Sequence, residues 1–345
     1  MYWSTYRNDY SEKTRKLSDF LAYQFPNQSA HYFLGQFEAC NNVSELSDSF
    51  VIADFLNENH YVFNGTEVLE DHDFNWHFST DLPPDIQRDT YIKHASGMLQ
   101  AIRLLGMKKV VFSRVKHVEF NTDKAFPLFN QLCQEYPKAF VYLVSSPLFG
   151  TWIGATPEIL LEVHGNHVFT MSLAATKSTD SSEEWNQKEL DEQQYVTDFI
   201  VDSLKENEIN SIEIVGPYSH EAGPVKHLRT DITFDLESLS PTVIANALHP
   251  TPAVSGLPRP LAMEMIEAIE KHDLNYNRSL YTGYIGKISD QETKLYVNLR
   301  CCQLFKDNAY LYVGGGFTKD SNVEDEWEET ERKSKTLLSV IQNVR

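Results

Sequence analysis

The segment EWEETERK (326–333) carries acidic and basic side chains at a spacing that could do chemistry. In a helix, Glu326, Glu329 and Lys333 would lie three and four residues apart and share one face. Such a face is either a solvated, ion-paired surface or part of a site for a divalent cation. A second predicted helix (184–207) supplies further carboxylates, Glu189, Asp191 and Glu192. Because Mg2+ prefers oxygen ligands, carboxylates that converge from two helices would form a magnesium site.

Three charged residues stand in segments with strand character. Lys109 opens KVVFSR and is either an edge residue or a buried lysine that can lose its proton and act as a base. Glu158 follows Pro157 and is either a surface residue or a carboxyl group whose pKa is raised by burial. Arg300 lies in the otherwise apolar VNLRCC, where an arginine usually meets an anion. These residues are candidates for acid–base chemistry on an anionic substrate.

Other signals of catalysis are weak. His227 and His249 are isolated histidines, and such residues are more often structural than catalytic. The sequence contains no Ser–His–Asp elbow, no P-loop and no dinucleotide-binding fingerprint. The run Gly314–Gly316 before the C-terminal helix could let backbone N–H groups approach a ligand.

The elements that must position these residues are mostly strands. Residues 31–70 alternate in short strand-like runs, and 79–87, with two prolines, is the best linker candidate. Further strands are predicted at 108–120, 139–146, 158–164, 167–173, 280–289, 294–305 and 309–317, the last three as an antiparallel meander. Helices are predicted at 91–106, 184–207, 261–271 and 323–343, the last with a capping box of Ser321 and Glu324. This order predicts an α+β fold with large antiparallel sheets in one domain, 1–345.

Composition narrows the class of protein. The 345 residues carry a formal net charge of −19, which argues against a nucleic-acid partner. An anionic substrate would therefore need positive charge gathered locally, from a metal or from a few Lys and Arg side chains. Four cysteines without a C-x-x-C pair, a polar N-terminal segment and the lack of a long apolar run predict a cytoplasmic protein without a membrane span.

Nine segments together resemble the chorismate-utilising enzymes, most closely the isochorismate synthases, over about residues 90–340. They are KVVFSR (109–114), GATPEILL (154–161), KELDEQQYV (188–196), HLRTDI (227–232), HPTPAVSGLP (249–258), YTGYIG (281–286), VNLRC (297–301), VGGGF (313–317) and EWEETERK (326–333). The resemblance implies the chorismate-binding α/β sandwich, two antiparallel sheets flanked by helices, with 1–80 as a variable N-terminal part. It also implies chorismate as substrate, a monomer and no glutaminase subunit.

The resemblance assigns roles to individual residues. Lys109 would be the base that activates water for attack at ring C2, and Glu158 the acid that protonates the departing C4 hydroxyl. Mg2+ would be held by Glu192, Glu326 and Glu329 and would bind the ring carboxylate. Arg300 and the backbone at Gly314 would take the enolpyruvyl carboxylate, and His249 would anchor its loop. The substrate-binding set is Ala175, Thr176, His227, Ala253, Val254, Tyr281, Arg300, Gly314 and Lys333.

The sequence departs from the family pattern at three positions. In LAATKS, Ala175 replaces a glycine and Lys177 an arginine, and Gln193 follows Glu192 where the family has histidine. Ala175 would serve in place of glycine unless its backbone needs a positive φ. There are three alternatives to isochorismate synthase. The first is salicylate synthase, the second is a paralogue that binds chorismate without turnover, and the third is anthranilate or aminodeoxychorismate synthase.

Overall fold

The computed structural model describes residues 19–41, 48–69, 76–222, 225–289 and 291–344. The polar N-terminal segment, from which we expect no secretion signal, falls mostly in residues 1–18. These residues lie outside the described part of the chain. The strands are β1 (Asp19–Gln24), β2 (Ala30–Cys40), β3 (Ser49–Ala53), β4 (His60–Val68), β5 (Lys109–Glu119), β6 (Phe140–Ser146), β7 (Gly150–Thr156), β8 (Ile159–His164), β9 (His167–Ser178), β10 (Glu213–Ala222), β11 (Val225–Asp235), β12 (Gly256–Leu257), β13 (Tyr284–Ile288), β14 (Glu292–Val297), β15 (Cys301–Phe305) and β16 (Asn308–Phe317).

The helices lie between these strands, and several match the predicted segments. They are α2 (Arg88–Leu105), a 3-10 turn η2 (Thr122–Lys124), α3 (Ala125–Glu135), α4 (Gln187–Glu206), α5 (Pro241–Leu248), α6 (Arg259–Ile266), a π-helix η3 (Glu267–Asp273) and α7 (Val323–Val344). The predicted α+β class is confirmed.

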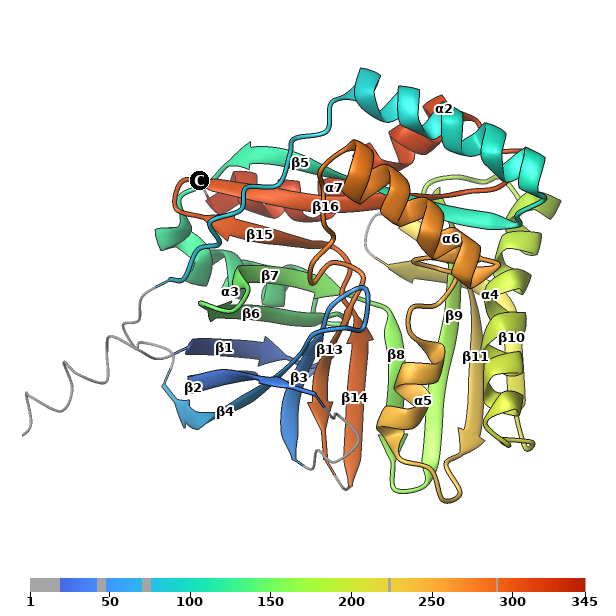
Figure 1. Ribbon diagram of the computed structural model, residues 1–345. Helices are drawn as coiled ribbons and strands as arrows, with labels where there is room; N and C mark the ends of the chain where they lie inside the picture. Colours follow the sequence, from blue (N-terminus) through green and yellow to red (C-terminus); the bar gives the residue numbers. More distant parts are fainter. Residues whose placement is uncertain (1–18, 42–47, 70–75, 223–224, 290, 345) are drawn as a thin grey trace, which may run out of the picture.

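The strands pair antiparallel in one hydrogen-bonded order, β10-β11-β9-β8-β14-β13-β3-β4-β2-β1-β6-β7-β15-β16-β5-β12. The two predicted sheets are therefore the two halves of a continuous sheet. We call them the β6 half (β1, β6, β7, β15, β16, β5, β12) and the β9 half (β13, β14, β8, β9, β11, β10). Strands β2, β4 and β3 join the halves where the sheet turns (Figure 1). The N-terminal strands thus sit at the centre of the sheet.

Three apolar clusters fill the layers. An inner cluster rich in aromatic rings receives Phe140, Tyr142 and Val144 of β6, whereas Val141 and Leu143 of the same strand face a second cluster under α3 and α7. A third cluster packs α4 and α5 on the β9 half. Because β6 is buried on both faces, its sequence is a continuous apolar run without polar alternation.

The prediction of one continuous strand at 294–305 is wrong, because the structure divides this segment into β14 and β15. The chain leaves the β9 half at the end of β14, and β15 begins in the β6 half, paired with β7 and β16. In the break, Asn298 accepts a hydrogen bond from the Tyr142 hydroxyl at 2.6 Å and donates one to the Leu280 carbonyl at 2.7 Å. Arg300 takes a φ of +47° there. The predicted three-strand meander is thus divided between the halves.

At the C-terminus one local expectation is confirmed and one differs. The glycine run Gly314–Gly316 lies inside β16, within the predicted strand 309–317, and is paired with β5. Helix α7 is capped by Asn322, whose side-chain oxygen accepts from the backbone N–H of Glu324 at 2.9 Å. Ser321 instead donates its hydroxyl to Glu326 at 2.8 Å.

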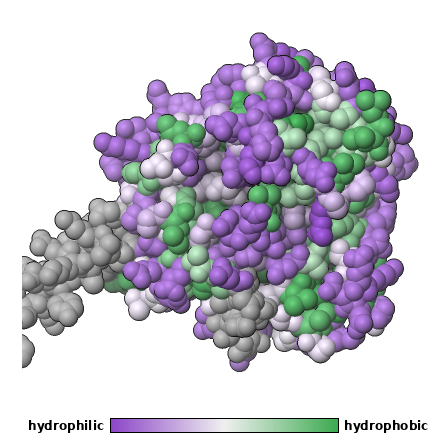
Figure 2. All heavy atoms as spheres, viewed as in Figure 1, coloured by the Kyte–Doolittle hydropathy of each residue, from purple (hydrophilic) through white to green (hydrophobic). Residues whose placement is uncertain are grey.

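The surface is largely polar on the face shown in Figure 2, where apolar atoms form separate patches. Among the described residues, no helix combines the length and the apolar character that crossing a bilayer would require.

A buried ion pair ties together the segments that carry site residues. Arg278 Nε lies 2.7 Å from Glu270 Oε2, and both side chains are almost fully buried. Glu270 also accepts from the Ser113 backbone N–H on β5 at 2.8 Å. Arg278 donates to the carbonyls of Val254 and Val111 at 2.7 and 2.8 Å. The pair therefore fixes the loop 249–258 against β5.

Replacing Glu270 by glutamine should destabilise the fold strongly. The change leaves the Arg278 charge buried without a carboxylate, which typically costs about 3–5 kcal/mol of the free energy of unfolding. Glu267→Gln on the same element is the control, because it breaks an exposed pair with Lys271. Urea unfolding of the three proteins measures the effect. Equal midpoints for the two variants would show that the buried pair does not stabilise the fold.

Candidate active site

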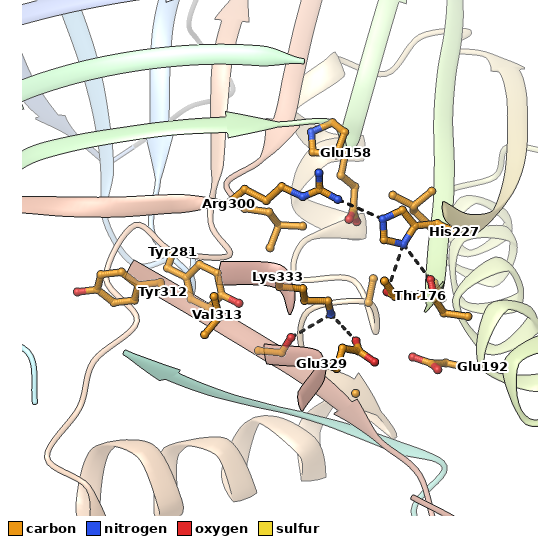
Figure 3. Close-up of a pocket in the computed structure, with 18 of the residues that line it drawn as sticks. Glu158, Thr176, Glu192, His227, Tyr281, Arg300, Tyr312, Val313, Glu329 and Lys333 are labelled. Atoms are coloured by element: carbon orange, nitrogen blue, oxygen red, sulfur yellow. Dashed lines mark hydrogen bonds and ion pairs between the residues drawn. The ribbon is translucent and has the colours of Figure 1, made fainter. Parts of the chain in front are cut away.

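The candidate site is a cavity of about 740 Å3, partly open to solvent, between the two halves of the sheet. Both halves, helices α4 and α7 and four loops contribute to its lining. Figure 3 shows Glu158, Arg300 and His227 on one side, and Glu192, Glu329 and Lys333 on the other. The lining residues are Lys109, Pro157, Glu158, Leu173, Ala174, Ala175, Thr176, Glu192, His227, Ala253, Tyr281, Leu299, Arg300, Tyr312, Val313, Gly314, Gly316, Glu329 and Lys333.

Two neighbouring crossovers between the halves place Glu158 and Arg300. One runs from β7 to β8 through Glu158, and the other from β14 to β15 through Arg300. The two crossovers bond to each other, because Val297 N–H donates to the Glu158 carbonyl at 2.9 Å and Ala155 N–H to the Arg300 carbonyl at 3.1 Å. Neither residue is in a regular strand, so both side chains can reach the cavity between the halves.

His227 is held as a neutral ring with a defined tautomer. An Arg300 N–H approaches Nε2 at 3.2 Å, and since arginine only donates, Nε2 must accept. The proton is therefore on Nδ1, which donates to the Ala175 carbonyl at 2.8 Å. Burial first, and then the charge of Arg300, lower the pKa of His227 to about 3. His227 thus orients Arg300 and does not act as a proton donor at neutral pH.

A bulge between β9 and β11 creates this arrangement. Lys226 pairs with Lys177 and Leu228 with Ala174, so Ala175 and Thr176 together oppose His227. Ala175 takes a φ of +56°, in the left-handed region that favours glycine. The position therefore does need a positive φ, and alanine occupies it with backbone strain.

Lys109 is nearly fully buried and forms an ion pair with Glu192 of α4, with 2.7 Å between Nζ and Oε1. The edge-residue alternative for Lys109 is therefore excluded. Gly316 leaves room for this pair, because a Cβ there would lie 2.6 Å from Lys109 Cε and 2.8 Å from Glu192 Oε1. Glycine at this point of β16 lets two charged side chains lie against the backbone.

The face of α7 brings its charged groups together as the spacing predicted. Lys333 Nζ lies 2.7 Å from Glu329 Oε1 and donates to the Gly314 carbonyl at 3.0 Å. Burial alone would lower the pKa of Lys333, but the carboxylates around it, Glu329 foremost, raise it above its usual value. Burial would likewise raise the pKa of Glu329, yet Lys333 holds it below its usual value. Lys333 is thus a fixed positive charge in the cavity.

Two buried polar residues anchor the helices that carry the carboxylates. Arg114 of β5 donates to Thr330 of α7 at 2.8 Å and stacks 3.9 Å from the Trp327 ring. Gln193 of α4 donates its side-chain N–H groups to Ser172 on β9 and to Thr230 on β11 at 2.7–3.0 Å. Gln193 in place of the family's histidine therefore fastens α4, and with it Glu192, to the sheet.

Glu158 is set up as an acid. The side chain is 5% exposed, and burial raises its pKa to about 7, against the opposing charges of Lys109, Lys333 and Arg300. A carboxyl group with this pKa is partly protonated at neutral pH and can give its proton to a leaving group. The cavity thus combines a protonated carboxyl, a buried lysine and two cations that can face an anion.

Each of the predicted magnesium ligands Glu192, Glu326 and Glu329 has a lysine partner of its own. Glu326 accepts from Ser321, and its second partner is Lys188 at 3.4 Å. In the described part of the chain, no three His, Cys, Asp or Glu side chains are arranged as the ligands of one metal ion. Burial first, and then the charges of Glu329 and Glu192, raise the pKa of Glu326 to about 7. The oxygen atoms of these carboxylates are the donors that a hard cation prefers.

The structure brings most of the predicted site residues into this cavity and leaves two aside. Val254, expected against the ring, is buried in the cluster under α5, because its carbonyl is fixed by Arg278 and only Ala253 reaches the cavity. Glu326 lies behind the wall, with Oε2 3.1 Å from where a Cβ on Gly315 would be. His249 anchors its loop as expected, its Nε2 3.2 Å from the Asp54 and Phe55 carbonyls.

Several features of the site were not predicted from the sequence. Lys177, which stands where the family has arginine, pairs with Glu189 at 3.1 Å and lies outside the cavity. Seven lining residues were not among the predicted catalytic, substrate-binding and metal residues: Pro157, Leu173, Ala174, Leu299, Tyr312, Val313 and Gly316. Four of them adjoin a predicted site residue, and Leu173, Tyr312 and Gly316 lie two positions from one, so the motifs around those residues were the available signal.

Comparisons with known proteins give one family. The sequence model described as "Chorismate binding enzyme" matches residues 42–342. A Mycobacterium tuberculosis protein assigned as isochorismate synthase MenF is 31% identical over 284 residues, which cover 75% of this chain and 74% of that protein. Isochorismate synthase DhbC of Bacillus subtilis is 30% identical over 260 residues, 68% of this chain and 63% of that enzyme.

Solved structures share the fold. The Escherichia coli menaquinone-specific isochorismate synthase MenF superposes with a TM-score of 0.78 over 95% of this chain and 89% of that one, at 18% identity. Component I of anthranilate synthase from Streptococcus pneumoniae gives a TM-score of 0.67 over 92% of this chain and 89% of that one, at 17% identity. Both likenesses support the chorismate-binding sandwich.

Ala175→Gly should stabilise the protein. The left-handed backbone costs alanine about 1–2 kcal/mol, while glycine loses about 0.5–1 kcal/mol more on ordering, which leaves a gain of up to about 1 kcal/mol. Ala174→Gly, at the adjacent residue with ordinary φ, is the control and should destabilise. Thermal and urea unfolding measure both. A less stable Ala175→Gly protein would show that the bulge carries no strain.

Proposed function

This chain belongs to the family of chorismate-binding enzymes, and we propose that within it the protein is an isochorismate synthase. The proposal rests on one observation, that Lys109 and Glu158 are both buried in the walls of one cavity. Moving a hydroxyl group around a diene needs a base for the incoming water and an acid for the departing hydroxyl. The amine-transferring relatives use ammonia and need no such base.

The proposed reaction balances with these two residues. Lys109, as the neutral amine, takes a proton from water while the water oxygen bonds to ring C2. The two ring double bonds shift, the C4–O bond breaks, and Glu158 gives its proton to the departing hydroxyl, which leaves as water. In the described arrangement Glu192 Oε1 lies 2.7 Å from Lys109 Nζ and fixes the position of the amine. The product is an isomer of the substrate.

The charges of the cavity suit a dianionic substrate. We assign the enolpyruvyl carboxylate to Arg300, whose guanidinium is positioned by His227, together with the backbone at Gly314. A planar guanidinium matches a carboxylate with two parallel hydrogen bonds. Thr176, Ala253 and Tyr281 line the remaining surface for the ring.

Mg2+ is the proposed cofactor. Glu192, Glu326 and Glu329 would hold it, and it would supply the positive charge that the ring carboxylate needs. Their carboxylate oxygens are the donors that Mg2+ prefers. The protein's own net charge of −19 gives further reason for a cation.

The proposed function is tested by incubating the purified chain with chorismate and Mg2+, with isochorismatase as the coupling enzyme. We expect coupled turnover that is lost in EDTA and restored by Mg2+. Release of salicylate and pyruvate without the coupling enzyme would identify a salicylate synthase instead. Anthranilate in ammonium buffer would indicate the amine-transferring class. Binding of chorismate without any product would indicate a paralogue without turnover.

Lys109→Ala should lower kcat by about 10²–10⁴, the usual contribution of a general base. Chorismate binding should persist, since Lys109 is not assigned to a carboxylate. Lys287→Ala, on β13 and outside the cavity, is the control for loss of a charge. Steady-state rates and calorimetric titration measure the two effects. A Lys109→Ala protein with the wild-type rate would remove the base from the mechanism.

Glu158→Gln should remove the alkaline limb of the pH–rate profile. The mechanism needs protonated Glu158, whose raised pKa of about 7 means that wild-type kcat/KM falls as the pH rises through that value. Glutamine cannot give a proton, so kcat should fall by about 10²–10⁴ and the remaining rate should lose this dependence. Initial rates between about pH 5.5 and pH 9 measure it. A wild-type profile that is flat through pH 7 would contradict the assignment of the acid.

A further inference from the structure

A second cavity of about 930 Å3, open to solvent, lies beside the first. We call it the basic cavity, because its lining contains Arg103, Lys108, Lys188 and Lys319 against two acidic residues, Asp191 and Asp320. The other lining residues are Ile102, Gly106, Met107, Tyr195 and Thr318. Four cations in one hollow are unusual for a chain in which acidic residues outnumber basic ones by 49 to 30.

Among the described residues, three of the four cations of the basic cavity lack the carboxylate partners that Lys109 and Lys333 have in the active-site cavity, whereas Lys188 is paired with Glu326. Lys108 Nζ lies 4.9 Å from the centre of the Tyr195 ring, and Arg103 Nε donates to the Lys319 backbone carbonyl at 2.8 Å. Among the described residues, the salt bridges include none from Arg103, Lys108 or Lys319. Asp191 accepts from Gln187 at 2.7 Å. Cations without a carboxylate partner create a positive potential that attracts anions.

Neighbouring residues at the start of β5, on α4 and at the end of β16 line the two cavities. Lys108 of the basic cavity is followed by Lys109 of the active-site cavity at the start of β5. On α4, Asp191 and Glu192 are likewise divided between the two. At the end of β16, Gly316 lines one and Thr318 the other. Lys188 of the basic cavity lies 3.4 Å from Glu326, which is behind the wall of the active-site cavity.

We propose that the basic cavity is a docking site for the substrate dianion before it reaches the active-site cavity. The inference rests on the proposed function, which supplies a substrate with two carboxylates. A chain with a net charge of −19 repels such an anion at long range, and the local cations offset this repulsion at the point where the two cavities adjoin. The adjoining walls favour the substrate over an unrelated anion as the occupant.

The test is the double variant Lys108→Gln/Lys319→Gln, compared with the control Lys287→Gln/Lys306→Gln, which removes the same charge outside both cavities. At low ionic strength, the first should raise KM for chorismate by about tenfold with kcat changed by less than about twofold. At about 0.5 M salt the difference should vanish, because screening removes the contribution of exposed charges. The control should follow wild type throughout. Thermal unfolding confirms that both variants fold.

Each other outcome overturns the inference. An equal loss in the control would show that only net charge matters. A loss that persists at high salt, or that lies in kcat, would show that the lysines act on the fold or on the chemistry. Inorganic phosphate is the probe for a separate anion site. It should compete with chorismate, and phosphate that alters kcat instead would identify an effector site. Absence of turnover in wild type would be a failure of the proposed function, seen before any variant is compared.

Discussion

The structure depends on the burial of charge between the two halves of its sheet. A charged group removed from water is costly unless an opposite charge or a hydrogen bond meets it. Here Lys109 is met by Glu192 and Lys333 by Glu329, and in each case the partners come from different elements or adjacent turns. These pairings specify where α4 and α7 must lie. Glu158 is the exception, because burial raises its pKa to about 7 against the opposing charges of Lys109, Lys333 and Arg300.

The fold meets this constraint with irregular backbone in a few places. The two crossovers between the halves carry Glu158 and Arg300 into the gap that regular strands could not reach. The bulge at Ala175 turns a carbonyl toward His227, which in turn orients Arg300. Glycine in β16 leaves space for the Lys109–Glu192 pair. Arg278 and Glu270, buried behind β5, hold the loop that brings Ala253 to the cavity.

Much of this arrangement could be predicted from the sequence, and the exceptions have physical reasons. Helical spacing alone placed Glu326, Glu329 and Lys333 on one face of α7. Apolar periodicity could not reveal the break between β14 and β15, since both pieces are apolar and the break is fixed by Asn298 through residues distant in the chain. The sequence raised the question of φ at Ala175, but only the register of β9 and β11 answers it. The buried pair of Glu270 and Arg278 has no sequence signature, because its members face each other only after η3 has formed.

In the proposed mechanism, water adds to one ring carbon and a hydroxyl leaves from another, with Lys109 and Glu158 on either side of the exchange. The most direct measurement is turnover of chorismate in water enriched in oxygen-18, followed by mass spectrometry and carbon NMR of the product. We expect isochorismate with one solvent oxygen, located at the C2 hydroxyl. Product that keeps the original hydroxyl oxygen of chorismate would contradict the mechanism, because the hydroxyl would then have moved without the attack of water.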